Sequence, residues 1–350
     1  MKRSAGLIQV LALVLAASTL AATSYQSAYE VLQAIGRGEE VEVTSRFSSY
    51  DVRSFIRAGG ARVTVVGAGF SGYDLRQFAA DGGKLILTAA TGAYDVRQCC
   101  AAGKDRVTVH GDDFSGYDLR QFAQDGARLV VTSKTSAYDV REVCRLAGNR
   151  TTVVAKGFSS YDLRQFAELG ARIQGEIDGG AYEVLQILRA GGRVTVDSRY
   201  SGYDLLQFSR EGKERVLIMA HGVSAYDARQ CATAGARLVL DSSFSGYDLR
   251  QLASAGSARV WLEAHGVSAY DARGFLEAGG QAIVDSSFSA YDVVTLARVA
   301  KERLHVRPDG FSSYDLNQIA SAGASISDSS VPPYDREGAR AERFAALHGM

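Results

Sequence analysis

The 350-residue chain has no excess of charge of either sign, because 39 Lys and Arg residues balance 39 Asp and Glu residues. This balance gives no argument for a nucleic-acid partner. Its four cysteines, Cys99, Cys100, Cys144 and Cys231, lack the spacing of metal ligands. They occupy expected core positions of helices, where buried free thiols are more probable than disulfides. The sequence therefore predicts no metal site and no cofactor.

Long apolar runs are also scarce, and the one present lies at the N-terminus. Lys2 and Arg3 precede the apolar run from Ala5 to Ala17, and small residues follow it. This pattern is typical of a secretory signal peptide, which we place at residues 1–22. Since the run is too short to span a bilayer comfortably, we expect a secreted or periplasmic chain with no membrane span after cleavage.

Residues that could form a unique catalytic cluster are few. His110, His221 and His265 follow expected strands, and the glycines form no phosphate-binding loop. Asp197, Asp241, Asp285 and Asp328 each follow a strand, where an Asx turn is favoured over a calcium-binding edge. Only the junction at Ile173–Gly180 departs from the regular pattern, and we interpret it as a duplication seam. The sequence therefore predicts a protein that is not an enzyme.

What the chain has in abundance is one short signature, Tyr-Asp or Tyr-Glu. Its fifteen copies are at Tyr29, Tyr50, Tyr73, Tyr94, Tyr117, Tyr138, Tyr161, Tyr182, Tyr203, Tyr226, Tyr247, Tyr270, Tyr291, Tyr314 and Tyr334. Steps of 21 and 23 residues alternate from Tyr29 to Tyr161, and the same series recurs from Tyr182, 153 residues later. A fixed period of this length indicates stacked structural repeats. We infer a seven-repeat block at 23–180, its tandem duplicate at 181–330, continuous with the first, and a C-terminal cap at 331–350.

Each repeat reads as one helix followed by one strand. Ser71 is a predicted helix N-cap, and Leu75, Phe78 and Ala79 form one apolar stripe. Gly82 ends the helix, and the β-rich residues 84–88 form the strand. Links this short favour parallel strands and right-handed crossovers. We therefore predict a right-handed α/β solenoid of about 14 helix–strand repeats, with one curved parallel sheet on the concave side and helices on the outer face.

This alternation resembles the α/β solenoids of the leucine-rich-repeat kind, some of which also alternate two repeat lengths. The resemblance covers the predicted mature chain, as architecture only. The leucine-rich pattern with its Asn or Cys ladder is absent, so the resemblance implies nothing about a ligand.

The signature itself is expected to be structural. Its Asp should lie at the N-terminus of a helix, where a negative charge is stabilised, and its Tyr can stack on a neighbouring repeat. Arg76, Arg97, Arg120, Arg141 and Arg164 recur three residues after the Tyr, and each can pair with the Asp of an adjacent repeat. We predict a ladder of such contacts.

A second recurring feature is a cation directly before each strand's apolar pair. The positions are Arg62, Lys84, Arg106, Arg128, Arg150, Arg172, Arg193, Arg215, Arg237, Arg259, Gln281 and Arg303. Like charges about 4.8 Å apart need neutralising, either by internal carboxylates or by a bound anionic polymer or acidic protein surface. Other outward positions on the sheet include Ile86, Val130, Leu217, Met219, Trp261 and Ile283.

The sequence thus favours a non-catalytic scaffold that binds a protein or an anionic envelope polysaccharide on its concave sheet. The candidate binding residues are Arg106, Arg128, Arg150, Arg172, Arg193, Arg215, Arg237, Arg259 and Trp261. Two alternatives remain open: a structural protein of the cell envelope that self-assembles end to end, and a polysaccharide-acting enzyme on a solenoid scaffold. Ring closure and the oligomeric state are left open too.

Overall fold

The computed structural model describes residues 25, 27–175, 177 and 179–326. The predicted signal peptide, the predicted C-terminal cap and the last signature Tyr lie outside the described residues. No helix among the described residues is long and apolar enough to cross a membrane.

Helices and strands alternate along the whole described chain. The helices are α2 (Ala28–Gly36), α3 (Ser49–Gly59), α4 (Gly72–Ala80), α5 (Ala93–Gly103), α6 (Gly116–Gln124), α7 (Ala137–Ala147), α8 (Ser160–Glu168), α9 (Ala181–Arg189), α10 (Gly202–Gly212), α11 (Ala225–Ala234), α12 (Gly246–Gly256), α13 (Ala269–Glu277), α14 (Ala290–Ala300) and α15 (Ser313–Ser321). The strands are β1 (Val41–Val43), β2 (Val63–Val66), β3 (Lys84–Leu87), β4 (Val107–His110), β5 (Arg128–Val131), β6 (Thr151–Val154), β7 (Arg172–Gln174), β8 (Val194–Val196), β9 (Val216–Met219), β10 (Arg237–Leu240), β11 (Val260–Glu263), β12 (Gln281–Val284), β13 (Leu304–Val306) and β14 (Ser325–Ile326).

The two repeat lengths correspond to two kinds of helix. Short repeats such as that of α4 have a nine-residue helix, whereas long repeats such as that of α3 have an eleven-residue helix followed by a 3-10 turn. The 3-10 turns before strands are Gly60–Arg62, Lys104–Arg106, Gly148–Arg150, Lys213–Arg215, Ser257–Arg259 and Lys301–Arg303. The predicted alternation of repeat lengths is therefore an alternation in how the helix joins its strand.

The first residue of each of these 3-10 turns has a backbone conformation that favours glycine. Lys213 has φ 50° and ψ −125°, whereas Gly60 has φ 56° and ψ −128° at an equivalent position. We expect Lys213→Gly to raise the free energy of unfolding by up to about 1 kcal/mol, because it removes backbone strain. Urea denaturation would measure the change, and a clear loss of stability would contradict this interpretation.

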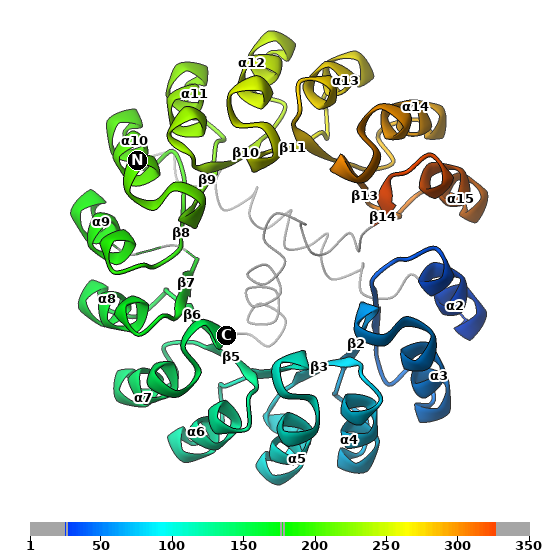
Figure 1. Cartoon of the computed structure of the whole chain (residues 1–350), viewed down its shortest axis with the longest axis vertical. Helices are drawn as coiled ribbons and strands as arrows, with labels where there is room; N and C mark the ends of the chain where they lie inside the picture. Colours follow the sequence, from blue (N-terminus) through cyan, green and yellow to red (C-terminus); the bar gives the residue numbers. More distant parts are fainter. Residues whose placement is uncertain (1–24, 26, 176, 178, 327–350) are drawn as a thin grey trace, which may run out of the picture.

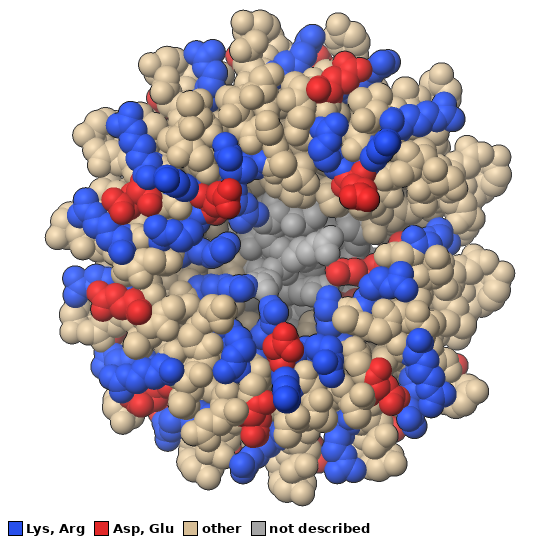
Figure 2. All heavy atoms as spheres, viewed as in Figure 1, with Lys and Arg blue, Asp and Glu red and all other residues tan. Residues whose placement is uncertain are grey.

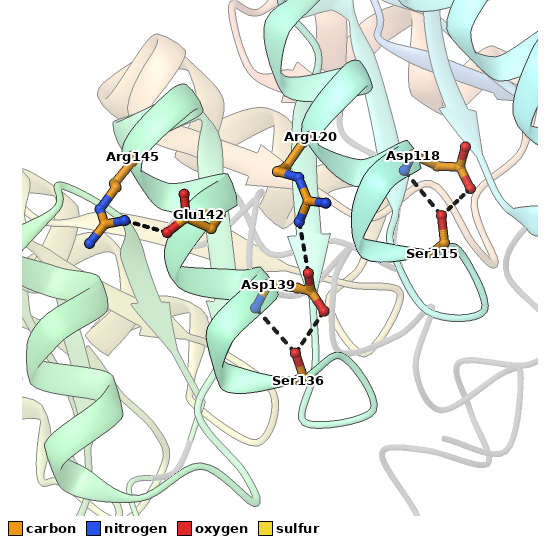
Figure 3. Close-up of polar contacts among 7 residues, drawn as sticks. All are labelled: Ser115, Asp118, Arg120, Ser136, Asp139, Glu142 and Arg145. Atoms are coloured by element: carbon orange, nitrogen blue, oxygen red, sulfur yellow. Dashed lines mark hydrogen bonds and ion pairs between the residues drawn. The ribbon is translucent and has the colours of Figure 1, made fainter.

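The helix start is built as predicted, with one difference in detail. The Ser115 hydroxyl accepts a hydrogen bond from the Asp118 backbone N–H at 3.2 Å and donates to the Asp118 carboxylate at 2.6 Å (Figure 3). The full reciprocal capping box, in which the acidic side chain also accepts from the N-cap N–H, is present among the described helices at Ser27, Ser201 and Ser312. At the other Ser-capped helices of the described chain the carboxylate accepts from the cap hydroxyl, whereas α5 and α9 have the glycine N-caps Gly92 and Gly180 and no side-chain cap.

A small residue precedes the signature Tyr because the next repeat packs against it. A Cβ atom on Gly116 would lie 2.0 Å from Oδ1 of Asp139, which belongs to the following helix. That carboxylate is fixed in place, since the Ser136 hydroxyl donates to it at 2.7 Å and Arg120 approaches it at 2.8 Å. Close packing at this position is therefore with the Asp side chain of the next repeat.

The strands form two parallel seven-stranded sheets, β1–β7 and β8–β14, each in chain order. This corrects the prediction of one continuous sheet. Within each sheet the paired residues are alternately 22 and 20 positions apart, as in Val41↔Val63 and Thr64↔Lys84. The break falls where two short repeats meet, because α8 and α9 both have nine residues. The alternation of long and short connections that sustains the register is interrupted at that point.

The repeats follow one another around a circle, with the strands inside and the helices outside, so that α2 lies beside α15 (Figure 1). Nη1 of Arg37, directly after α2, donates to Oδ1 of Asn317 in α15 at 3.3 Å. The predicted placement of strands on the concave side and helices on the outer side is confirmed.

The hydrophobic core lies between the sheets and the surrounding helices. The predicted stripe is fully buried, with Leu75, Phe78 and Ala79 each 0% exposed. The phenylalanine before the N-cap packs edge-on against this stripe, with 5.2 Å between the ring centroids of Phe70 and Phe78. One such layer per repeat gives a continuous core that no single repeat could form alone.

Candidate binding surface on the inner face

The inner face of the ring is defined by strand alternation. Val63 and Val65 are 0% exposed and face the helices, so Thr64 between them faces the centre of the ring. In short repeats the first strand residue faces the centre instead, because Leu85 and Leu87 are buried and Lys84 is half-buried. We call the residues on this side the inner face.

The recurring cations fall into two groups. The arginines of the long repeats bind the C-terminal end of the helix in the preceding repeat. Arg150 donates to the carbonyl oxygens of Ala123 and Ala127 at 3.2 and 3.1 Å. Arg215 donates to those of Leu188 and Gly192 at 2.6 and 3.1 Å. Carbonyls at a helix C-terminus carry partial negative charge, so they stabilise a cation there.

The same contact recurs in other long repeats. Arg303 donates to the carbonyls of Leu276 and Gly280 at 2.6 and 2.9 Å, and Arg106 donates to that of Ala79 at 3.2 Å. The internal partners of these arginines are therefore backbone carbonyls and not the carboxylates that were predicted. Among the candidate residues, Arg106, Arg150 and Arg215 are therefore held against helix ends.

The cations of the short repeats are placed on the inner face. They begin strands β3, β5, β7 and β10 as Lys84, Arg128, Arg172 and Arg237. Lys84 lies 3.5 Å from Glu40, and Nε of Arg128 donates to the carbonyl of Asp105 at 2.9 Å. At the equivalent position of β12, Gln281 donates to the carbonyl of Ala258 at 2.6 Å.

Positive charge is concentrated where the first sheet ends. Burial of the Arg172 side chain, together with the charges of Arg128 and Arg193, lowers the pKa of Arg172 from its ordinary value. Lys and Arg side chains gather along the inner rim on the side of β6–β8 (Figure 2). The surroundings of Arg172 therefore disfavour its charge, and an anion at this place would relieve the repulsion.

The two halves of the inner face have different chemistry, although the blocks are duplicates. Positions 153 residues apart are equivalent, and Thr64, Thr108 and Thr152 of the first sheet correspond to Leu217, Trp261 and His305 of the second. Leu217, Val239, Trp261 and Ile283 form an apolar cluster separate from the main core, with Met219 packed against it. We call these five residues the apolar inner cluster. Ile86 and Val130 of the first sheet, which correspond to Val239 and Ile283, are apolar too, so the two halves differ mainly at the positions of Leu217, Trp261 and His305.

His–Asp pairs lie beyond the carboxyl ends of strands in the second block. Nδ1 of His221 lies 2.6 Å from Asp241, and that of His265 lies 3.1 Å from Asp285. The predicted Asx turns are confirmed at Asp197, Asp241 and Asp285, as where the backbone N–H of Ser243 donates to Asp241 at 3.0 Å, and Asp328 lies outside the described residues. Within the described chain, no group of three or more His, Cys, Asp and Glu side chains is arranged to hold a metal ion.

The turn at Asp241 makes the free energy of unfolding depend on pH. Burial alone would raise the pKa of Asp241, but hydrogen bonds from Ser243 and His221 outweigh it and the pKa is lowered. A lowered carboxyl pKa stabilises the fold above the unfolded-state value of about 3.9, and this contribution is lost as the pH falls through the folded-state value. Asp241→Asn should therefore lower stability near neutral pH, and its difference from the parent protein should shrink on acidification.

Urea denaturation of both proteins between about pH 6 and about pH 3 would measure this difference. A difference that stays constant over the whole range would show that the ionised carboxylate of Asp241 contributes nothing.

The four cysteines are free and buried, as predicted. Burial raises the pKa of Cys99, helped by the charge of Asp95, and it raises the pKa of Cys144; both values reach about 12. Because only the thiolate attacks a disulfide reagent, we expect negligible reaction of the native protein and release of four equivalents after unfolding. Titration with an aromatic disulfide would test this, and rapid reaction of any thiol in the native protein would contradict it.

The tyrosines of the signature line one edge of the helical layer, and those described are 59–80% exposed. The predicted ladder between repeats is present in part, because Arg141 reaches Asp162 of the next helix, whereas Arg164 pairs with Glu168 of its own helix. Arg120 reaches Asp139 of the next helix (Figure 3), and Arg250 lies 5.5 Å from the ring centroid of Tyr270 in the next repeat. Arg145 and Glu142 form a further ion pair within α7. These contacts support a structural role for the signature.

Comparison with known proteins gives no relative by sequence. No family model matches the chain, and no curated protein does either. Among solved structures, a putative lyase/mutase from Burkholderia cenocepacia J2315 is 15% identical, with a TM-score of 0.25 over 54% of this chain and 78% of that one. A structure described as native KDPGal is 14% identical, with a TM-score of 0.25 over 55% of this chain and 91% of that one. Both names point to enzymes, but likeness this weak carries no argument about activity.

Proposed function

We propose that this protein is a closed-ring repeat scaffold, secreted or periplasmic, that binds an anionic envelope polymer on the inner face of its first sheet. The observation that carries the proposal is the series of cations Lys84, Arg128 and Arg172 that begin strands β3, β5 and β7 on this face, and the charges of Arg128 and Arg193 act on Arg172 where the sheet ends. Partner carboxylates or other anionic groups would neutralise charges that repel one another there.

The other inner-face residues of the first sheet favour an extended polymer over a folded protein as the partner. Thr64 pairs with Lys84, Thr108 with Arg128 and Thr152 with Arg172 across neighbouring strands. A threonine hydroxyl thus lies beside a cation in three strand pairs. These pairs contain none of the large apolar side chains that dominate protein interfaces. A chain that carries regularly spaced anions can contact this series repeatedly.

Ring closure is supported by the repeat lengths. Both α15 and α2 have nine residues, so their junction joins two short repeats in the same way as the junction of α8 and α9. The Arg37–Asn317 hydrogen bond occupies the faces that end-to-end assembly would require. Closure with right-handed crossovers therefore fits better than an open, self-assembling solenoid.

A non-catalytic role is part of the proposal. The Ser, Asp, Arg and Tyr side chains that could perform chemistry recur at equivalent positions of many repeats, where they cap helices or join neighbours. An active site is needed once, whereas these contacts are needed in every repeat.

Binding of purified anionic polysaccharides at low and high salt would test the proposal. We expect salt-sensitive binding that is lost in Arg128→Glu/Arg172→Glu and retained in Arg237→Glu, the matched control at the same strand position of the second sheet. Equal loss in both variants, or no binding by the parent protein, would refute it. Binding of acidic proteins in place of polysaccharides would change the class of partner.

A further inference from the structure

The apolar inner cluster presents large side chains on the side of the sheet that faces away from the helices. Met219 on β9, Val239 on β10 and Trp261 on β11 are paired directly across three neighbouring strands. Leu217, Val239, Trp261 and Ile283 are nevertheless only 3–7% exposed. All the described helices lie on the outer side of the strands (Figure 1), so the burial of these side chains calls for a further layer.

The fold itself does not require this cluster. The first sheet has the same strand order and the same alternating register with Thr64 and Thr108 where the second has Leu217 and Trp261. Leu217 and Trp261 thus join Val239 and Ile283 in one continuous apolar patch, which favours an apolar occupant on this part of the inner face.

The chain supplies such an occupant, because 24 residues follow Ile326. Their sequence reads as a helix from Arg336 to about Leu347, in which Ala341, Phe344 and Ala345 have the i, i+3, i+4 spacing of one apolar stripe. Leu347 extends the stripe by another i+3 step. The sequence of this segment thus has the pattern expected of a helix that packs one face against an apolar surface.

The starting point of this segment lies near the cluster. Strand β14 pairs with β13, whose His305 ring lies 5.1 Å from the Trp261 ring, centroid to centroid. Three strand spacings separate β14 from β11, about 14 Å in all, whereas 24 extended residues reach about 80 Å. The segment is therefore long enough to cover the cluster.

The expected alternative position, as a cap on the last repeat, is less favourable. The face of the last repeat that a cap would cover already lies beside α2, where Arg37 hydrogen-bonds to Asn317. In addition, residues 327–350 contain Asp328, Asp335, Glu337 and Glu342 against Arg336, Arg340 and Arg343, so the segment is nearly neutral and has little attraction to the cationic half.

We propose that residues 327–350 dock on the apolar inner cluster, with Phe344 and Leu347 packed against Trp261 and its neighbours. The docked segment would cover the second half of the inner face. This inference does not depend on the proposed polymer binding, since it concerns the opposite half of the ring.

Trp261 is the single tryptophan of the chain, so its fluorescence reports this contact alone. In the full-length protein we expect blue-shifted emission and slow quenching by acrylamide. Phe344→Asp/Leu347→Asp should shift the emission to the red and raise the quenching constant several-fold. The matched control, Ala339→Asp/Ala346→Asp, adds two carboxylates on the opposite face of the predicted helix and should leave both signals unchanged.

A chain that ends at Ile326 provides a second measurement, with circular dichroism to confirm that it is folded. A synthetic peptide of residues 327–350 should restore protection of Trp261 when it is added to this shortened chain. Rapid quenching in the full-length protein would overturn the proposal. Undiminished protection in Phe344→Asp/Leu347→Asp would overturn it too, and dependence of that protection on protein concentration would then identify a second copy as the cover.

Discussion

Replacing Arg215 by methionine is expected to lower the free energy of unfolding by about 2–4 kcal/mol, because hydrogen bonds from a charged donor contribute about 1.5–3 kcal/mol each. Arg215 donates to carbonyls at the end of α9, and it also donates to the carbonyl of Glu211 in its own helix at 3.2 Å. Methionine keeps most of the side-chain volume but leaves these carbonyls without their donor.

The matched variant is Arg172→Met, for which we expect a smaller loss of stability than for Arg215→Met. The pKa of Arg172 is lowered by burial and by the charges of Arg128 and Arg193, so the folded state disfavours its charge. Urea denaturation of both variants measures the contrast. Equal destabilisation would mean that the two kinds of arginine have the same structural role, which would weaken the case for a binding surface at Arg172.

Replacing Phe122 by alanine is expected to lower the free energy of unfolding by about 3–5 kcal/mol, the usual cost of a large cavity in a core. The Phe122 side chain is 1% exposed, and its ring lies edge-on to that of Phe114 with the centroids 5.0 Å apart. The cavity would also remove contacts between neighbouring repeats, since each core layer packs on the next.

Tyr117→Ala in the same helix is the control for this prediction. The Tyr117 side chain is 62% exposed, and we expect a change within about 0.5 kcal/mol. Thermal and urea unfolding of the two variants would give the comparison. A Phe122 variant as stable as the Tyr117 variant would show that the repeats do not share one continuous core.

The local structure of the repeats was predictable because each signal lies within a few residues. The cap at Ser71 and the stripe of Leu75, Phe78 and Ala79 specify the helix, and all three stripe side chains are buried as expected. The division into two sheets was not predicted, although its cause is visible in the sequence as two successive steps of 21 residues around Tyr182. Strand pairing depends on the residue spacings of several successive repeats. A change in one spacing is therefore easy to find in the sequence, but its effect on the pairing of strands is not.

The candidate site was predictable only in part. Arg106 and Arg128 occupy equivalent positions before a strand, yet one binds a helix carbonyl and the other begins a strand on the inner face. The difference comes from the 3-10 turn of the long repeats, which changes the direction of the side chain. The apolar character of the second half could have been found by aligning the two blocks, because Thr108 then falls opposite Trp261.

Small-angle X-ray scattering of the protein is the measurement that tests the central claim most directly. A closed ring predicts a monomer whose distance distribution is that of a hollow disc and does not change with protein concentration. An elongated distribution, or a mass that grows with concentration, would show that α2 and α15 do not meet within one chain, and the ring with its two-part inner face would have to be abandoned.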